Sequence, residues 1–181
     1  INQPAVYAFW WPRFEHIAEW FVENEEKRAE VYAVAGVEQK GEAKLDGTDF
    51  SLFAIADRID VRKDDGYFEV IDYKTGNIPT AKRVAAGFAP QLPLEAWLLE
   101  QGGFPSLVGE VKDLVFWELK GGDPVQRQVR PVKDIEHSVE VAGKGLRDLV
   151  EAFSKESTPY LSNPRPSEAG YGDYDHLARV K

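Results

Sequence analysis

Alternating apolar and polar positions between residues 50 and 76 predict two β-strands joined by a tight turn at 64–66. In the first strand, alternate positions form an apolar row that one carboxylate interrupts: Phe53, Ile55, Asp57, Ile59 and Val61. The corresponding row of the second strand consists of Phe68, Val70, Asp72 and Lys74. Two acids and a lysine are therefore predicted on faces that otherwise resemble a protein core.

The length of the turn decides which of these charged side chains meet. A two-residue loop at 64–65 places Asp57 opposite Asp72, with Cβ atoms about 5 Å apart. A two-residue loop at 65–66 places Asp57 opposite Lys74 and leaves Asp72 a diagonal neighbour at about 7 Å. A three-residue loop separates the charged side chains, because a slip of one residue turns every side chain to the other face.

Two carboxylates at this separation repel each other and are costly to remove from water. A divalent cation relieves both costs, and ligation by one or two carboxylates suits Mg²⁺ or Mn²⁺. Lys74 is then placed to orient a water or to stabilise charge on a phosphate. The alternative from the pattern alone is an Asp–Lys ion pair between neighbouring strands at the edge of a sheet.

The spacing of Asp72 and Lys74 is not specific by itself, since an acid two residues before a lysine recurs along the chain. The other examples begin at Glu25, Glu38, Glu42, Glu110 and Glu118. Asp72 differs from these in lying at the end of an apolar strand, which a turn pairs with a second acid.

The rest of the chain predicts an α/β fold, with a mixed β-sheet flanked by helices. Strands are expected at 34–45, 111–119 and 125–129, and helices at 12–32, 81–86, 90–101 and 134–154. The first helix carries an apolar stripe that we expect to pack on the sheet as core: Phe14, Ile17, Ala18, Phe21 and Val22. Segment 157–181 is rich in Pro, Gly and Ser and is expected to form an extended tail.

The composition predicts one domain of ordinary size with a sizeable core, from 181 residues of which 43% are hydrophobic. We find no apolar run near the ~20 residues that cross a bilayer and no signal peptide, so we expect a cytoplasmic protein that does not contact a membrane. The absence of Cys excludes disulfides and a Cys-ligated iron-sulfur cluster. The chain begins at Ile1 and contains no Met, which suggests a piece of a longer protein.

The net charge of −9 argues against a DNA-binding protein that acts alone, because such proteins generally present a basic face to phosphates. Basic residues do lie near the predicted hairpin, and a domain supplied with DNA by a partner could rely on such a local patch. They are Arg58, Arg62, Lys63, Lys74, Lys82 and Arg83.

Segments 56–60 (ADRID), 70–76 (VIDYKTG) and 91–94 (QLPL) together resemble the RecB-like branch of the PD-(D/E)XK nuclease superfamily. Segments 8–14 (AFWWPRF) and 174–181 (YDHLARVK) resemble the C-terminal nuclease domain of AddB subunits, which belong to bacterial helicase-nucleases that resect double-strand breaks. The resemblance implies a restriction-endonuclease-like fold and Mg²⁺-dependent DNA cleavage. It also implies an AddA-type partner subunit, in a branch without an iron-sulfur cluster.

By position, the resemblance implies that Asp57 and Asp72 are metal ligands together with the backbone carbonyl of Tyr73. Lys74 matches the catalytic lysine of the family, and Glu38 matches an upstream acid.

Gln91 matches the first residue of the family's Gln-x-x-x-Tyr signature, and we group it with Arg58, Lys82 and Arg83 as candidates to face DNA. The chain departs from the family in having Glu95 where the signature has Tyr. It also lacks a match to the family's upstream metal-binding His, since His16 stands in a different local sequence.

These departures keep a second interpretation open, in which the domain is an inactive nuclease-like scaffold or binds DNA without cutting it. A third is an unrelated α/β domain with a salt-bridged hairpin.

Overall fold

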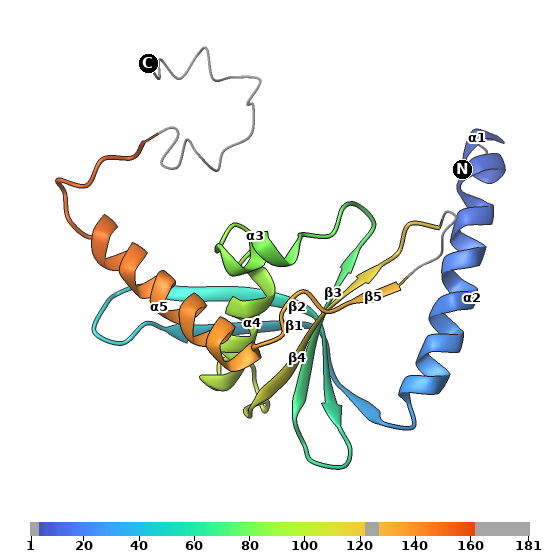
Figure 1. Cartoon of the computed structure of the whole chain (residues 1–181), viewed down its shortest axis with the longest axis horizontal. Helices are drawn as coiled ribbons and strands as arrows, with labels where there is room; N and C mark the ends of the chain where they lie inside the picture. The colour runs from blue at the N-terminus through green and yellow to red at the C-terminus, as the bar shows by residue number, and fades with distance from the viewer. Residues whose placement is uncertain (1–3, 122–126, 162–181) are drawn as a thin grey trace. The chain divides into compact units, whose positions relative to one another are not determined.

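The structure is a computed structural model that describes residues 4–121 and 127–161 (Figure 1). Its helices and strands follow the predicted order, with one extra short helix at the start. The elements are α1 (Pro4–Phe9), α2 (Trp11–Arg28), β1 (Tyr32–Lys44), β2 (Ser51–Arg62), β3 (Phe68–Lys74), α3 (Ala81–Ala85), α4 (Gln91–Glu100), β4 (Val111–Glu118), β5 (Arg127–Val129) and α5 (Ile135–Phe153).

The five strands form one mixed sheet in the order β1-β2-β3-β4-β5. Neighbouring strands run antiparallel except β3 and β4, which are parallel. A parallel pair needs a crossover connection, and α3 with α4 supplies it between these two strands. The predicted mixed sheet flanked by helices is therefore confirmed.

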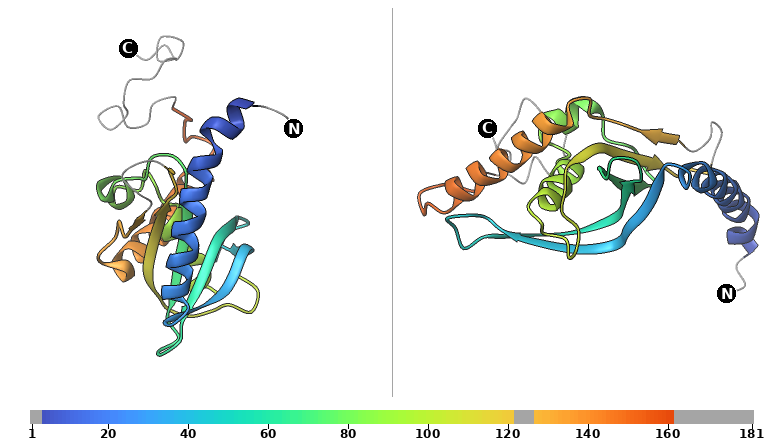
Figure 2. Two further views of the ribbon diagram at one scale, coloured as in Figure 1. Left: turned by 90° about the vertical axis from the view of Figure 1, so that its right-hand side faces the viewer. Right: turned by 90° about the horizontal axis from the view of Figure 1, so that it is seen from below.

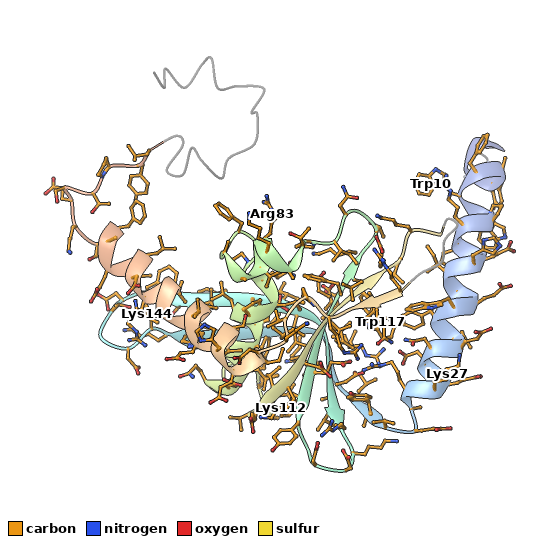
Figure 3. All side chains as sticks on the ribbon, viewed as in Figure 1. Trp10, Lys27, Arg83, Lys112, Trp117 and Lys144 are labelled. Atoms are coloured by element: carbon orange, nitrogen blue, oxygen red, sulfur yellow. The ribbon has the colours of Figure 1, made fainter. Side chains whose placement is uncertain are left out.

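Helices cover both faces of the sheet, as the two further views show (Figure 2). On one face, α4 buries Leu92, Ala96 and Leu99 against residues of β2, β3 and β4 in the larger core cluster. On the other face, Trp20 and Phe21 of α2 pack on a smaller cluster centred on Trp117 of β4. Figure 3 shows Trp117 between the sheet and α2.

Buried ion pairs add to the contact between α2 and the sheet. The Nη2 atom of Arg28 lies 2.7 Å from Asp60 Oδ2 and 2.5 Å from Glu69 Oε1, and both acids are almost fully buried. Arg58 bonds Asp60 as well and reaches Glu25 of α2 at 2.6 Å. Since each buried charge has an opposite charge beside it, the cost of removing these groups from water is partly offset.

The predicted apolar row of β2 is wrong in its first half. Phe53 and Ile55 are 69% and 50% exposed, whereas Ile59 is fully buried. The core side of the first half is formed instead by Leu52, Ala54 and Ala56. The alternation reverses around Asp57, and the facing residue of β1, Glu38, has a φ of 47°. A left-handed residue interrupts the regular pleat of a strand, which local sequence pattern does not reveal.

The expectation that the first helix buries its whole apolar stripe is also wrong. Ile17 and Ala18 are half-buried and Phe21 packs on the sheet, but Phe14 and Val22 are each 56% exposed. The described part of α2 therefore contacts the sheet only through some of its apolar side chains.

The chain divides into two compact units, residues 1–146 and 147–181, with the boundary inside α5. In the second unit, Thr158 Oγ1 donates to the carbonyl of Ala152 at 2.5 Å, and the rings of Phe153 and Tyr160 stack at 4.8 Å. Most of the predicted tail, 162–181, lies outside the described residues, as does the start of the predicted strand at 125.

None of the described helices has the length and apolar character that would let it cross a membrane.

Candidate active site

The β2–β3 hairpin brings the two predicted aspartates together. The pairs Arg58 with Ile71 and Ile59 with Val70 set a register that, one pair further, places Asp57 opposite Asp72. This confirms the first of the two registers expected from the sequence and excludes the one that pairs Asp57 with Lys74.

The turn reaches this register with a longer loop than expected. Arg62 N–H donates to the Tyr67 carbonyl at 2.8 Å, so the loop runs from Lys63 to Gly66 rather than over two residues. Gly66 has a φ of 77°, a conformation that glycine adopts without steric cost. A loop longer by two residues preserves the facing of every side chain, because the strand repeat is also two.

Asp72 lies at the centre of the site and is 1% exposed. Its Oδ1 accepts from Gln91 Nε2 at 2.5 Å and from Lys74 Nζ at 2.9 Å. Its Oδ2 makes no hydrogen bond and is held only by the charge of Lys74 Nζ, 2.8 Å away. Burial raises the pKa of Asp72, and Asp57 raises it further, although Lys74 and Gln91 oppose the shift.

Lys74 occupies the last position of β3, with its side chain 29% exposed. Its ammonium group donates to Gln91 Oε1 at 3.2 Å as well as to Asp72. Gln91 is the first residue of α4, so the crossover from β3 returns the chain to the same end of the strand. The predicted residues Asp57, Asp72, Lys74 and Gln91 thus gather at the carboxyl end of β3.

Glu95 is a third carboxyl group in this site, and the sequence analysis did not assign it a role. It lies one turn after Gln91 on α4 and is 3% exposed. Gln91 Nε2 donates to Glu95 Oε1 at 3.2 Å, while Glu95 Oε2 makes no hydrogen bond. Burial, with smaller contributions from Asp72 and Asp57, raises the pKa of Glu95 to about 8. The shared helix face of positions 91 and 95 was the available signal, since a helix aligns residues four apart.

Arg58 does not face this site. It is 5% exposed on the α2 side of β2, bonded to Asp60 and Glu25, and its guanidinium lies 5.4 Å from the Trp117 ring centroid. The predicted contact of Arg58 with DNA is therefore wrong, because the side chain is buried in the ion-pair network between α2 and the sheet. Ordinary strand alternation puts it there, since the next residue, Ile59, packs in the core cluster on the other face.

The other predicted residues lie on four different elements. Lys82 and Arg83 are exposed on α3, and Figure 3 shows Arg83 on the outer side of that helix. Glu38 is exposed on β1, across from Asp57 in the strand register. The N–H of Tyr73 donates to Asp57 Oδ2 at 2.8 Å, and its ring packs on the α2 side. His16 is exposed on α2.

The family model of the PD-(D/E)XK nuclease superfamily matches residues 4–170. The chain belongs to this superfamily. The mixed sheet with helices on both faces agrees with the restriction-endonuclease-like fold. Membership in the superfamily implies that the protein is a nuclease.

Several curated relatives come from Rickettsia species and are named as uncharacterized proteins. A protein of Rickettsia conorii is 29% identical over 179 residues, which cover 87% of this chain and 21% of the relative. Proteins of Rickettsia felis and Rickettsia typhi are each 39% identical over 85 residues, or 46% of this chain and 9% of the relative. The chain thus spans about a fifth or less of the length of these relatives.

The site offers oxygen donors that fit the divalent cation associated with this superfamily. Glu95 Oε2 is a buried acceptor without a hydrogen bond among the described residues, and such an atom costs free energy until something pairs with it, while Asp72 Oδ2 is paired with the Lys74 ammonium at 2.8 Å. A hard cation would pair with them, and carboxylate oxygens suit Mg²⁺ or Mn²⁺. In the described part of the chain, no group of three or more His, Cys, Asp or Glu is already arranged as a metal site. The fit therefore rests on the buried carboxylate oxygens of Asp72 and Glu95.

Proposed function

We propose that this chain is a Mg²⁺- or Mn²⁺-dependent deoxyribonuclease domain that hydrolyses phosphodiester bonds. The observation that carries the proposal is the convergence of Asp57, Asp72 and Lys74 at the carboxyl end of β3, beside the buried Glu95. Superfamily membership supports the same reaction class.

Each residue has a distinct part in the proposed reaction. Asp57 and Asp72 would hold the cation, with the Tyr73 carbonyl as a further ligand and Glu38 as a more distant candidate. The cation, when bound, supplies Lewis acidity to the scissile phosphate and to an attacking water. Lys74 Nζ orients that water and offsets negative charge on the phosphate, and Gln91 holds Lys74 and Asp72 in position through its amide.

In this proposal, Glu95 carries a proton that it loses when the cation binds. Its pKa of about 8 leaves it mostly protonated at neutral pH in the cation-free site. A cation nearby favours the ionised form, so binding would release this proton to solvent.

The biological setting we infer is processing of duplex DNA ends by a helicase-nuclease complex with an AddA-type partner. The length of the Rickettsia relatives supports it, because most of each relative lies outside the region similar to this chain. A chain of net charge −9 also needs another source of DNA affinity. Lys82 and Arg83, exposed on α3, are the local candidates for phosphate contact.

The test is cleavage of linear single-stranded and double-stranded DNA with Mg²⁺, Mn²⁺ or EDTA. We expect metal-dependent cleavage that Asp72→Ala and Lys74→Ala both abolish. Asp49→Ala and Lys44→Ala are matched controls, since these exposed residues pair with each other on the surface, and they should cleave normally. If no cleavage is seen, Mn²⁺ binding measured on the same proteins distinguishes an intact metal site from an inactive scaffold.

If the parent protein binds Mn²⁺ without cleaving DNA, and Asp72→Ala loses that binding, the metal site is intact. Such a site would lack either a further ligand or the helicase partner. No metal binding by the parent protein would instead support the inactive scaffold, because a scaffold has no use for a cation beside Asp72.

A further inference from the structure

We propose that the exposed aromatic face of α1 and the start of α2 is a stacking platform for single-stranded DNA. The platform consists of Tyr7, Phe9, Trp10, Trp11 and Phe14. The inference rests on the proposed nuclease function and names the form of the substrate that the site receives.

The first observation is the exposure of these rings, which ranges from 50% for Trp11 to 71% for Phe9. Five large aromatic side chains within eight positions are costly to leave in water unless something covers them. They are also organised: the Trp11 ring lies 6.2 Å from that of Tyr7 and 5.6 Å from that of Phe14. A ligand with flat apolar faces fits such an array better than an aliphatic one.

The second observation is the local charge. Residues 4–14 contain no Asp or Glu in a chain of net charge −9, and they contain Arg13. The guanidinium of Arg13 lies 5.8 Å from the centroid of the Trp10 ring. The first acid along α2, Glu15, accepts from the indole N–H of Trp11 at 2.7 Å, which fixes that ring. Aromatic rings beside a cation match the chemistry of single-strand binding, in which bases stack and phosphates are paired.

The third observation links the platform to the catalytic end of the sheet. A Cβ atom at Gly121 would lie 2.7 Å from the Arg13 carbonyl oxygen, so the chain leaving β4 passes directly against α2. Two residues earlier, Leu119 N–H donates to the carbonyl of Lys74 at 2.8 Å. Between them, Lys120 Nζ lies 3.4 Å from Asn77 Oδ1 in the loop after β3 and forms an ion pair with Glu118 Oε1 at 2.7 Å, which a phosphate would have to share. A basic side chain therefore lies along the short stretch between Lys74 and the platform.

Single-stranded DNA is favoured over a duplex because only unpaired bases expose their faces for stacking. Figure 3 shows Trp10 projecting from the start of α2, and a base can stack on the face of its ring that Arg13 does not cover. A strand that crosses Lys120 toward the platform would keep its backbone beside Lys74.

The experiment measures binding of fluorescein-labelled oligo(dT), about 16 nucleotides long, by anisotropy in EDTA, where no cleavage occurs. The double variant Phe9→Ala/Trp10→Ala should weaken binding by about 10-fold or more. Phe53→Ala is the matched control, since it removes an equally exposed ring from β2. Its affinity should equal that of the parent, and Trp10→Phe should retain most of the affinity because it keeps an aromatic face.

Two further readouts keep the test independent of folding and of catalysis. Oligo(dT) should quench the tryptophan fluorescence of the unaltered parent protein, because stacked bases quench indole emission, and blunt duplex DNA should quench it less. Asp72→Asn should lose cleavage while keeping parental oligo(dT) affinity, so failure of the proposed nuclease is visible separately from failure of the platform.

Equal oligo(dT) affinity in the parent and in the folded double variant would overturn the proposal, as would a parent protein that binds no oligo(dT). A parent dimer that becomes monomeric in the double variant, with oligo(dT) binding unchanged, would assign the face to a second copy of the chain instead.

Discussion

The backbone N–H of Tyr73 donates to Asp57 Oδ2 at 2.8 Å, so the carboxylate of one strand is tied to the main chain of the next. This bond fixes the Asp57 side chain beside Asp72, at the point where the alternation of β2 reverses. One residue later, Arg58 turns to the opposite side of the sheet and joins the ion pairs under α2. The ordinary alternation of a strand therefore separates a catalytic candidate from a structural charge.

Asp72→Asn should make the metal-free protein more stable. Burial raises the pKa of Asp72, which means that its ionised form weakens the folded state at neutral pH, and a neutral amide removes that cost. We expect a gain of roughly 1 kcal/mol in the free energy of unfolding by urea at pH 7. Mg²⁺ should stabilise the parent but not the variant, and the exposed control Asp49→Asn should change neither value. A less stable Asp72→Asn protein in EDTA would contradict this account.

Glu95 should make stability depend on pH. Its folded pKa of about 8 exceeds its unfolded value, so the folded state holds a proton that the unfolded state has lost between about pH 4.5 and 8. Its contribution to stability is fully present below that range and is lost as pH rises through it, at up to about 1.4 kcal/mol per pH unit. Urea unfolding of the parent and of Glu95→Gln, measured from pH 5 to pH 8.5, should give curves that converge at low pH. Parallel curves across the range would show that Glu95 titrates normally.

Arg28→Met should be strongly destabilising. The substitution leaves Asp60 and Glu69 buried without the guanidinium that pairs with both, and breaking a buried pair from one side costs about 3–5 kcal/mol. Lys112→Met is the matched control, because its pair with Glu110 is about half exposed and contributes less than about 1 kcal/mol. Equal losses in the two variants, measured by urea unfolding, would show that the network under α2 rearranges freely.

Two glycines of α5 should respond in opposite directions to alanine. A Cβ at Gly143 would lie 2.5 Å from the Trp97 ring, so Gly143→Ala forces the helix and α4 apart and should lower the melting temperature. A Cβ at Gly145 meets nothing within 4 Å, so Gly145→Ala gains the helix propensity of alanine, about 0.5–1 kcal/mol. Thermal unfolding of the two variants tests the pair, and the same sign for both would contradict the packing of Gly143 on Trp97.

The sequence by itself determined the order of the elements, but it left three registers of the hairpin open, of which two place Asp57 and Asp72 on one face. Hydrophobic period and turn residues are local properties, and they located α4, β4 and the β2–β3 hairpin within a few residues. The observed register is the first of these, with Asp57 opposite Asp72. The loop is longer than predicted, but adding two residues leaves a strand's alternation intact.

Only the tertiary structure decided which polar and aromatic residues are buried. Glu95 is buried because α4 lies on β3, and Arg58 because Glu25 of α2 and Trp117 of β4 lie against it. Phe14 is exposed because the start of α2 extends past the sheet (Figure 1). The environment of each of these side chains comes from elements far away in the chain. Periodicity gives the side of a helix or strand on which a residue lies, and the fold decides what covers that side.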